Sequence, residues 1–282
     1  MNKVLLPTDF SENSLNALHY AIKMFEGESC EFDIIHSFNV STSSLSSTRK
    51  KEKNTRVYHL AEEKAKEEMK SLLVKLREEH IGEEHKIRGF TTDETISSSM
   101  YKAAKEMKAD YVVMGTKGAT GAAEIFLGSN TVDVIKALKY TPVLAVPDNY
   151  KFKNPEKILF ANDFKRNFEP EEVGPLKNIA KLIGAEVVIL YLEGSEELSE
   201  IQLKNKTELF RLLEGVKVSE IVLKKDFSVA ETIQEYLENE KLGMLCMINN
   251  HHSFMDGLFR EPVVKQVAFH VEVPFLVMPE VE

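Results

Sequence analysis

The sequence predicts an α/β protein made of two like domains, each with a five-stranded parallel sheet and helices on both faces. Three observations support this fold class: the length of the chain, an internal repeat, and the alternation of short apolar strands with amphipathic helices. The chain has 282 residues, of which 43% are hydrophobic and 29% charged. This composition suits two globular domains of about 100 to 200 residues each. Alternating strands and helices favour βαβ units, and therefore parallel sheets with right-handed crossovers.

The internal repeat is visible at both ends of each half. Residues 3–10, KVLLPTDF, match residues 157–164, KILFANDF, so both halves begin with an apolar strand that leads into Asp-Phe. Residues 141–147, TPVLAVP, match residues 273–279, VPFLVMP, which are apolar strands bounded by proline. Because the first and the last strands of the two halves both match, the repeat predicts two copies of one domain in tandem.

The repeat also predicts the domain boundaries. We expect a first domain over residues 1–148 and a second over residues 156–282. The segment 148–156 between them contains Asn154-Pro155, a pair typical of turns, and is expected to be a linker.

Short apolar runs predict the strands of both repeats. In the first repeat they cover residues 3–7, 32–36, 85–90, 111–114 and 142–146. In the second repeat they cover residues 157–161, 186–192, 217–223, 244–248 and 274–278. The two closing strands, 142–146 and 274–278, are natural edges for mutual pairing, which would make the tandem an internal pseudo-dimer.

Helical periodicity fills the intervals between these strands. Ser11 is expected to cap a helix whose apolar residues recur at helical spacing, namely Leu15, Leu18, Ile22 and Phe25. Residues 57–80 predict a second helix rich in Lys and Glu, and Asp93 or Thr92 is expected to cap a third. The serine-rich segment 41–48 breaks the pattern and is expected to be a surface loop.

Charge and composition exclude several classes of protein. The net charge of −9 disfavours nucleic acid as a partner, because a phosphate backbone requires a basic surface. The start of the chain has no apolar region of signal-peptide length, and no apolar run reaches the roughly 18 residues of a membrane span. We therefore expect a cytoplasmic protein with no membrane association. Cys30 and Cys246 have no disulfide or metal-site spacing and are expected to be buried thiols.

A glycine-rich loop lies between a strand and a helix in the first repeat. Tyr111–Gly115 is the strand, and the loop continues through Gly118 to Gly128 and Ser129. Glycines let backbone N–H groups approach a ligand closely, and a helix start presents unpaired N–H groups and a positive dipole end. This arrangement suits a bound phosphate.

The spacing of Gly115, Gly118, Gly128 and Ser129 is G-2x-G-9x-G-[S/T], and this pattern resembles that of the nucleotide-binding universal stress proteins. The resemblance covers both repeats, although the motif occurs only once. It implies Rossmann-like domains of the adenine nucleotide alpha hydrolase-like type. It also implies a bound ATP or AMP, with a divalent cation such as Mg²⁺ on the phosphates and no metal-ligating residue of the protein.

The resemblance further implies a set of site residues. The adenine-side wall would be formed by Pro7, Thr8 and Asp9, and the floor by the backbone near Ser37. The ribose and first phosphate would contact Met114, Gly115, Lys117 and Gly118. The distal phosphates would contact Gly128, Ser129, Asn130 and Thr131.

A purely structural interpretation of these residues stays open. Glycines before a helix often serve only as turns, and Ser129 would then be an N-cap. Asp9 would likewise be a helix or turn cap.

The second repeat departs from the motif. Its counterpart strand runs into Asn249-Asn250-His251-His252, and Arg260-Glu261-Pro262 stands where Gly-Ser is expected. Glu261 would repel a phosphate and Pro262 lacks an N–H, so we predict that this repeat does not bind nucleotide. His251 and His252 are neighbours that would point apart, and they do not predict a metal site.

No catalytic residue is predicted. The chain lacks the P-loop, the G-x-G-x-x-G fingerprint and the G-x-S-x-G elbow. We therefore expect a nucleotide-binding stress-response protein that regulates an unknown protein partner and has at most weak ATP hydrolysis. Two alternatives stay open: a nucleotide-independent interaction scaffold and a slow ATPase. An internal pseudo-dimer is expected, and a homodimer of chains is also compatible with the sequence.

Overall fold

The computed structural model describes residues 1–38, 55–79, 85–116, 127–148, 150–193, 197–224, 236, 242–249 and 272–280. Within these ranges the first repeat has five strands: β1 Asn2–Thr8, β2 Cys30–Ser37, β3 Lys86–Thr92, β4 Tyr111–Gly115 and β5 Val143–Val146. The second repeat has β6 Lys157–Asn162, β7 Glu186–Glu193, β8 Val218–Lys224, β9 Met244–Asn249 and β10 Phe275–Pro279. The helices are α1 Glu12–Met24, α3 Arg56–Glu78, α4 Ile96–Met107, α5 Ser129–Ala137, α6 Pro170–Ile183 and α7 Glu200–Leu212.

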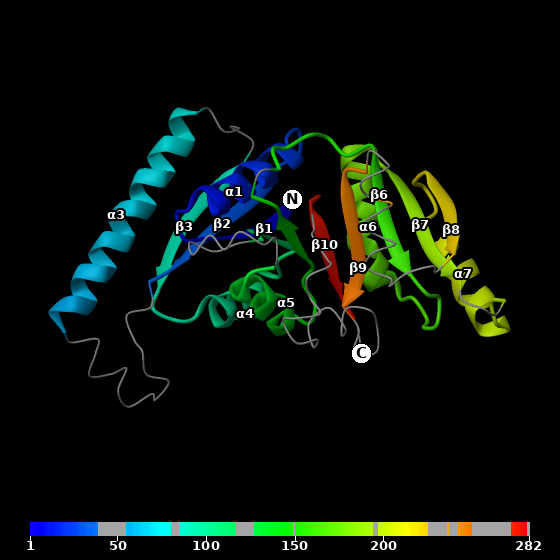
Figure 1. Ribbon diagram of the computed structural model, residues 1–282. Coiled ribbons are helices and arrows are strands. Elements are labelled where there is room, and N and C mark those ends of the chain that lie inside the picture. Colours follow the sequence, from blue (N-terminus) through cyan, green and yellow to red (C-terminus); the bar gives the residue numbers. More distant parts are fainter. Residues whose placement is uncertain are drawn as a thin grey trace.

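All ten strands form one sheet in the order β3-β2-β1-β4-β5-β10-β9-β6-β7-β8. Each repeat contributes five parallel strands, and the two halves meet where β5 and β10 pair antiparallel, with Leu144 opposite Leu276. Figure 1 shows β10 beside the first repeat at the centre of the sheet. The predicted fold class and the predicted pairing of the two closing strands are both confirmed.

The described helices cover both faces of this sheet. Buried residues of α1, α3, α6 and α7 share one hydrophobic core, whereas those of α4 and α5 belong to a second core on the opposite face. The alternation of side chains along each strand explains the division: Val4 and Leu6 of β1 face the first core, and Leu5 between them faces the second. The first repeat is therefore doubly wound, and in the second repeat the described helices α6 and α7 both cover the face of the first core.

The helix starts show where sequence reasoning succeeded and where it failed. Ser11 is the N-cap of α1, as predicted, and its Oγ accepts a hydrogen bond from Ser14 N at 3.3 Å. The predicted cap of the third helix was wrong. Thr95 caps α4 and accepts from Ser98 N at 3.4 Å, because the Thr92 hydroxyl is already engaged by Glu94 N at 3.2 Å in the preceding turn.

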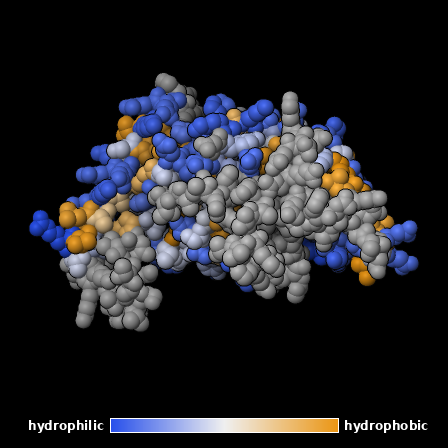
Figure 2. Space-filling model, in the orientation of Figure 1, coloured by the Kyte–Doolittle hydropathy of each residue, from blue (hydrophilic) through white to orange (hydrophobic). Residues whose placement is uncertain are grey.

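Helix α3 packs against the edge strand β3 at one end of the sheet (Figure 1). Gly89 lets this helix approach closely, because a Cβ at that position would lie 2.5 Å from the Met69 sulfur. The surface along α3 is mainly hydrophilic, with apolar residues near its first turns (Figure 2). Val57 and Leu60 are the exposed apolar residues there.

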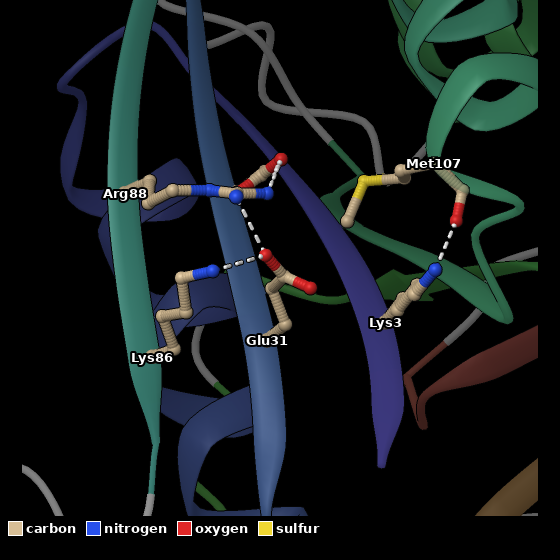
Figure 3. Close-up of polar contacts among 6 residues, drawn as sticks. Lys3, Glu31, Lys86, Arg88 and Met107 are labelled. Carbon is tan, nitrogen blue, oxygen red and sulfur yellow. Dashed lines mark hydrogen bonds and ion pairs between the residues drawn. The ribbon is translucent and has the colours of Figure 1, made fainter.

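Ion pairs join β2 to β3 on the face of the sheet that lies away from α3 (Figure 3). Arg88 donates two hydrogen bonds of 2.7 Å to the Asp33 carboxylate and lies 2.6 Å from Glu31 Oε1. Lys86 Nζ lies 3.1 Å from the same Glu31 oxygen. Because Glu31 and Asp33 are both buried, these cations neutralise two carboxylates that would otherwise be costly to remove from water.

The linker is attached to the first repeat through buried Asn16 of α1. Asn16 Nδ2 donates to the carbonyls of Pro147 and Tyr150, both at 3.1 Å, and its Oδ1 accepts from Lys151 Nζ at 3.2 Å. The Tyr150 hydroxyl in turn donates to the Gly243 carbonyl of the second repeat at 3.3 Å. Hydrogen bonds therefore connect this segment to both halves of the molecule.

Candidate functional site

The candidate site lies at the carboxyl ends of β1 and β4. From β1 the chain extends the sheet toward β2 and β3, and it then returns to the other side of β1 to form β4. Loops leave such neighbouring strands in opposite directions, and the resulting crevice is where doubly wound sheets bind ligands. Asp9 directly follows β1, and Gly115 ends β4, so the structure brings these two predicted site residues to one crevice.

The turn after β1 has a sparsely populated backbone conformation. Phe10 has φ +61°, which is unusual for a residue other than glycine. Hydrogen bonds hold the turn: Phe10 N donates to Thr8 Oγ1 at 3.0 Å, and Ser11 N donates to Asp9 Oδ1 at 3.0 Å. The Thr8 hydroxyl also shares a 3.0 Å hydrogen bond with that of Ser14 on α1.

The second repeat has the same turn. Phe164 has φ +54°, its N–H donates to Asn162 Oδ1 at 3.2 Å, and Lys165 N donates to Asp163 Oδ1 at 3.1 Å. Because this turn recurs in the repeat that lacks the glycine motif, the aspartate has a structural role in both repeats. Any contact of Asp9 with a ligand would be additional to that role.

Gly115 is needed for a contact within the protein. A Cβ at this position would lie 2.6 to 2.7 Å from three side-chain atoms of Asn13 on α1. Asn13 is only 6% exposed. The glycine therefore allows α1 to pack against the end of β4.

The two ends of the glycine loop are joined by their backbones. Gly128 N donates to the Thr116 carbonyl at 2.5 Å, and Thr116 N donates to the Val146 carbonyl at 3.0 Å. The buried Thr131 hydroxyl donates to the Gly115 carbonyl at 2.9 Å. These bonds hold the start of α5 next to the end of β4, as a phosphate-binding loop requires.

The interpretation of Ser129 as an N-cap is wrong. Gly128 is the N-cap of α5, and it offers no side-chain hydrogen bond to the helix. Ser129 and Asn130 are exposed in the first turn. The first N–H groups of a helix have no acceptor within it, so this open start presents donors and two polar side chains at the crevice.

The remaining predicted residues differ in accessibility. Pro7 and Met114 are buried in their strands, and the Ser37 hydroxyl at the end of β2 donates to the Glu94 carbonyl. Lys117 and Gly118 lie outside the described residues, as do the serine-rich segment 41–48 and the residues 250–271 of the second repeat.

Sequence reasoning missed two residues of this site, Asn13 and Thr116. Thr116 is 1% exposed, and its hydroxyl has no hydrogen-bond partner within the part of the chain that the structure describes. Buried polar atoms usually have a partner, so this hydroxyl is an additional candidate contact for a ligand. A signal for Asn13 existed: polar Asn13 and Asn16 interrupt the apolar face of α1 at a spacing of three residues.

The register of the sheet shows how the second repeat differs. Val4 pairs with Tyr111, and its counterpart Ile158 pairs with Met244. Four residues further along, Gly115 therefore corresponds to Ile248, which is 7% exposed. The second repeat therefore has a buried isoleucine of the first core where the first repeat has glycine.

In the second repeat, a network of ion pairs lies at the carboxyl ends of the strands. Arg166 contacts Glu172 of α6, whose side chain is fully buried, and Arg166 Nε lies 3.7 Å from Glu280 after β10. Arg166 therefore links the turn after β6 to the start of α6 and to the end of β10.

Three further features bear on chemistry. Among the described residues, no group of three His, Cys, Asp or Glu side chains is placed to hold a metal ion. Cys30 and Cys246 are both buried and free, as predicted. A search of the described helices finds none that combines the length and the apolar character of a membrane span.

Comparison with known proteins agrees with this architecture. The sequence profile of the universal stress protein family matches residues 1–147. A universal stress protein of Methanocaldococcus jannaschii is 32% identical over 146 residues, which are 51% of this chain and 81% of that protein. The crystal structure of a universal stress protein from Archaeoglobus fulgidus matches 100% of this chain and 97% of that one, with a TM-score of 0.68 and 19% identity.

A further solved structure is a universal stress protein in complex with cAMP. It is 20% identical, covers 51% of this chain and 96% of that one, and has a TM-score of 0.33. The family profile covers more than half of the chain, and the likeness to the Archaeoglobus protein extends over both repeats. The chain therefore belongs to the universal stress protein family and has a tandem fold.

Proposed function

We propose that the first repeat binds an adenine nucleotide, ATP or AMP, in the cytoplasm, and that binding regulates a protein partner instead of leading to catalysis. The observation that carries the proposal is the hydrogen bond from Gly128 N to the Thr116 carbonyl. It closes the glycine loop at the crevice between β1 and β4 and holds the open start of α5 there.

The chemistry of the described residues fits a nucleotide. The start of α5 supplies N–H donors and a positive dipole end for phosphate oxygens, and Ser129 and Asn130 add exposed polar groups. The Thr116 hydroxyl, which has no hydrogen-bond partner among the described residues, supplies a further hydrogen-bonding group. Asp9, on the other side of the crevice, is the group proposed to face the adenine or ribose.

A divalent cation such as Mg²⁺ is proposed to accompany the phosphates. Mg²⁺ is commonly held by phosphate oxygens and waters, with few protein ligands.

One nucleotide per chain is proposed. Ile248 and the Arg166–Glu172 pair distinguish the second repeat from the first. We propose that residues 1–148 form the binding domain, and that residues 156–282 form a partner domain joined to it as an intramolecular pseudo-dimer.

Two experiments test the proposal. Mass spectrometry identifies any nucleotide that is released from freshly purified protein, and calorimetric titrations measure the binding of ATP, AMP and cAMP. We expect ATP or AMP to bind with a stoichiometry of one per chain. Failure of both nucleotides to copurify or to bind at millimolar concentration would replace this proposal with a nucleotide-independent scaffold. Phosphate release above background that disappears in a Ser129→Asp variant would instead indicate a slow ATPase.

Matched variants locate the site. Ser129→Asp places a negative charge at the start of α5 and is expected to weaken ATP binding about tenfold, equivalent to roughly 1.4 kcal/mol. Ile201→Asp adds the same charge to an exposed position in the first turn of α7 in the second repeat. This control is expected to leave binding unchanged. Equal affinities of the two variants would place the nucleotide elsewhere.

A further inference from the structure

A series of hydrogen bonds leads from the glycine loop to the linker. Gly128 N donates to the Thr116 carbonyl and so joins the two ends of the loop, and Thr116 N donates to the Val146 carbonyl at 3.0 Å. Val146 is the last residue of β5, and Pro147 follows it directly before the linker. One hydrogen bond therefore connects the end of the loop to the residues from which the linker starts.

Helix α1 holds the first turn of the linker in place. The Asn16 amide, which is buried, donates to the carbonyls of Pro147 and Tyr150. Tyr150 N donates to the Pro147 carbonyl at 3.1 Å and closes the turn. Three residues before Asn16 on the same helix, Asn13 packs against Gly115. Helix α1 therefore contacts both the end of β4, where the glycine loop begins, and the linker.

Tyr150 extends these contacts to the second repeat. The antiparallel pairing of β5 with β10 places the carboxyl end of β5 at the same edge of the sheet as the amino ends of β10 and β9. There the Tyr150 hydroxyl donates to the carbonyl of Gly243, the residue before β9, at 3.3 Å. Burial raises the pKa of Tyr150, so the phenol keeps its proton at neutral pH. Gly243 also lies against the linker, because a Cβ there would be 2.5 Å from the Pro155 Cβ.

The hydrogen bond between Tyr150 and Gly243 is a side-chain contact outside the strand pairing of both repeats, so it can break while both sheets stay folded. The free energy of such a local opening is set by the contacts that hold the segment. An opening of the loop at Thr116 releases the Val146 carbonyl, and with it one restraint on the position of Pro147. A ligand that binds only the closed loop makes this opening rarer.

We propose that the linker couples nucleotide binding in the first repeat to the start of β9 in the second, through the hydrogen bond between Tyr150 and Gly243. This inference rests on the proposed function and names its regulation. A nucleotide that closes the glycine loop stabilises the Pro147 turn, and the turn holds the Tyr150 hydroxyl on Gly243. Coupling between two sites is reciprocal. Loss of this hydrogen bond therefore weakens nucleotide binding, although Tyr150 is not among the proposed contacts of the nucleotide.

Amide hydrogen exchange of the full chain, followed by NMR with and without saturating ATP or AMP, tests the coupling. The reporters are the amides of Gly243 and Leu245, which donate to Lys157 and Pro274. We expect the bound nucleotide to slow their exchange about threefold or more, as the net contribution of one hydrogen bond allows. The amide of Leu213 at the end of α7 is the reference for global stabilisation and should slow less. Equal slowing at all three amides, or none, overturns the inference.

A variant with a matched control identifies the contact. Tyr150→Phe keeps the ring and removes the hydroxyl, so it should abolish the extra slowing at Gly243 and weaken nucleotide binding about two- to fivefold. Tyr140→Phe removes the same atom from a tyrosine that is 74% exposed and should change neither. A Tyr150→Phe protein that behaves like this control contradicts the inference.

The same measurements separate this inference from the proposed function. If neither ATP nor AMP binds, both are wrong. If a nucleotide binds with an affinity that Ser129→Asp lowers, while exchange at Gly243 in the unmodified protein does not respond, the binding site stands and the coupling is wrong.

Discussion

The Asn13 side chain occupies the space in which a Cβ on Gly115 would lie. This contact joins the start of α1 to the end of β4 and so connects the turn after β1 with the glycine loop. The requirement for glycine at this position is therefore set by packing inside the domain, before any ligand is considered.

Gly115→Ala is expected to destabilise the protein by about 1 to 2 kcal/mol, because a Cβ would meet Asn13 atoms at 2.6 Å in a buried position. Urea unfolding measures the loss of unfolding free energy. The double variant Gly115→Ala with Asn13→Ala should recover part of this loss, because the smaller side chain makes room for the Cβ. Gly174→Ala is the control: it lies within α6, where a Cβ would meet nothing within 4 Å. That change should be neutral or stabilise by up to about 1 kcal/mol. A Gly115→Ala protein as stable as the control contradicts the packing argument.

Replacing the two phenylalanines with positive φ should have unequal effects. Glycine relieves the backbone strain in both, but Phe164 is fully buried, whereas Phe10 is partly exposed. We expect Phe164→Gly to cost roughly 3 kcal/mol or more through lost burial. Phe10→Gly should lower the free energy of unfolding by at least about 1 kcal/mol less than Phe164→Gly, because Phe10 buries less apolar surface. Thermal and urea unfolding of both variants provide the comparison, and equal losses would show that burial does not decide the outcome.

Arg166→Met should destabilise the second repeat by about 2 to 3 kcal/mol, because it leaves the fully buried Glu172 carboxylate without its cation. The control is Arg211→Met, which breaks an ion pair with Glu208 in which both side chains are substantially exposed. That change should fall within about 0.5 kcal/mol of the unmodified protein. Denaturant unfolding distinguishes the two, and a neutral Arg166→Met would show that Glu172 finds another partner.

The ion pairs of Figure 3 predict a loss of stability in acid. The hydrogen bond from Lys86, and then the charge of Arg88, lower the pKa of the Glu31 carboxyl from its usual 4.5. A group with a lowered folded-state pKa contributes stability above its unfolded pKa and loses it as the pH falls through the folded value. Stability from Glu31 should therefore be complete above about pH 5 and decline below pH 4.5.

Glu31→Gln removes this contribution, so the difference in unfolding free energy between the two proteins should shrink as the pH falls from 7 toward 3. Glu68→Gln on α3 is the control, since Glu68 pairs with Lys64 where both side chains are exposed. A difference between Glu31→Gln and the unmodified protein that stays constant with pH would contradict the assignment.

Much of the fold could be predicted from sequence because its signals are local. The apolar runs mark all ten strands to within two residues at each end, and Ser11 has the chemistry of an N-cap followed by apolar residues at helical spacing. The proline-bounded closing strands predicted their own pairing. Thr92, Asp93 and Thr95 all have side chains that can cap the start of α4. Thr95 is the N-cap, whereas the Thr92 hydroxyl accepts a hydrogen bond from Glu94 N. The sequence alone does not distinguish these residues, because the difference depends on tertiary geometry.

The candidate site was less predictable, because its decisive contacts join segments far apart in the chain. The glycine spacing predicted a loop, but it carried no information that Asn13 packs against Gly115 or that Thr116 is buried. The positive φ of Phe10 and Phe164 was also unforeseen, since phenylalanine has no local preference for that conformation.

The antiparallel pairing of β5 and β10 has a consequence for how the two halves were free to diverge. In a dimer of identical chains, any substitution appears in both subunits, and the assembly dissociates on dilution. Here the linker keeps the second half at a high effective concentration next to the first at any protein concentration. One copy could thus have Ile248 and the Arg166–Glu172 pair, while the other kept Gly115 and Gly128.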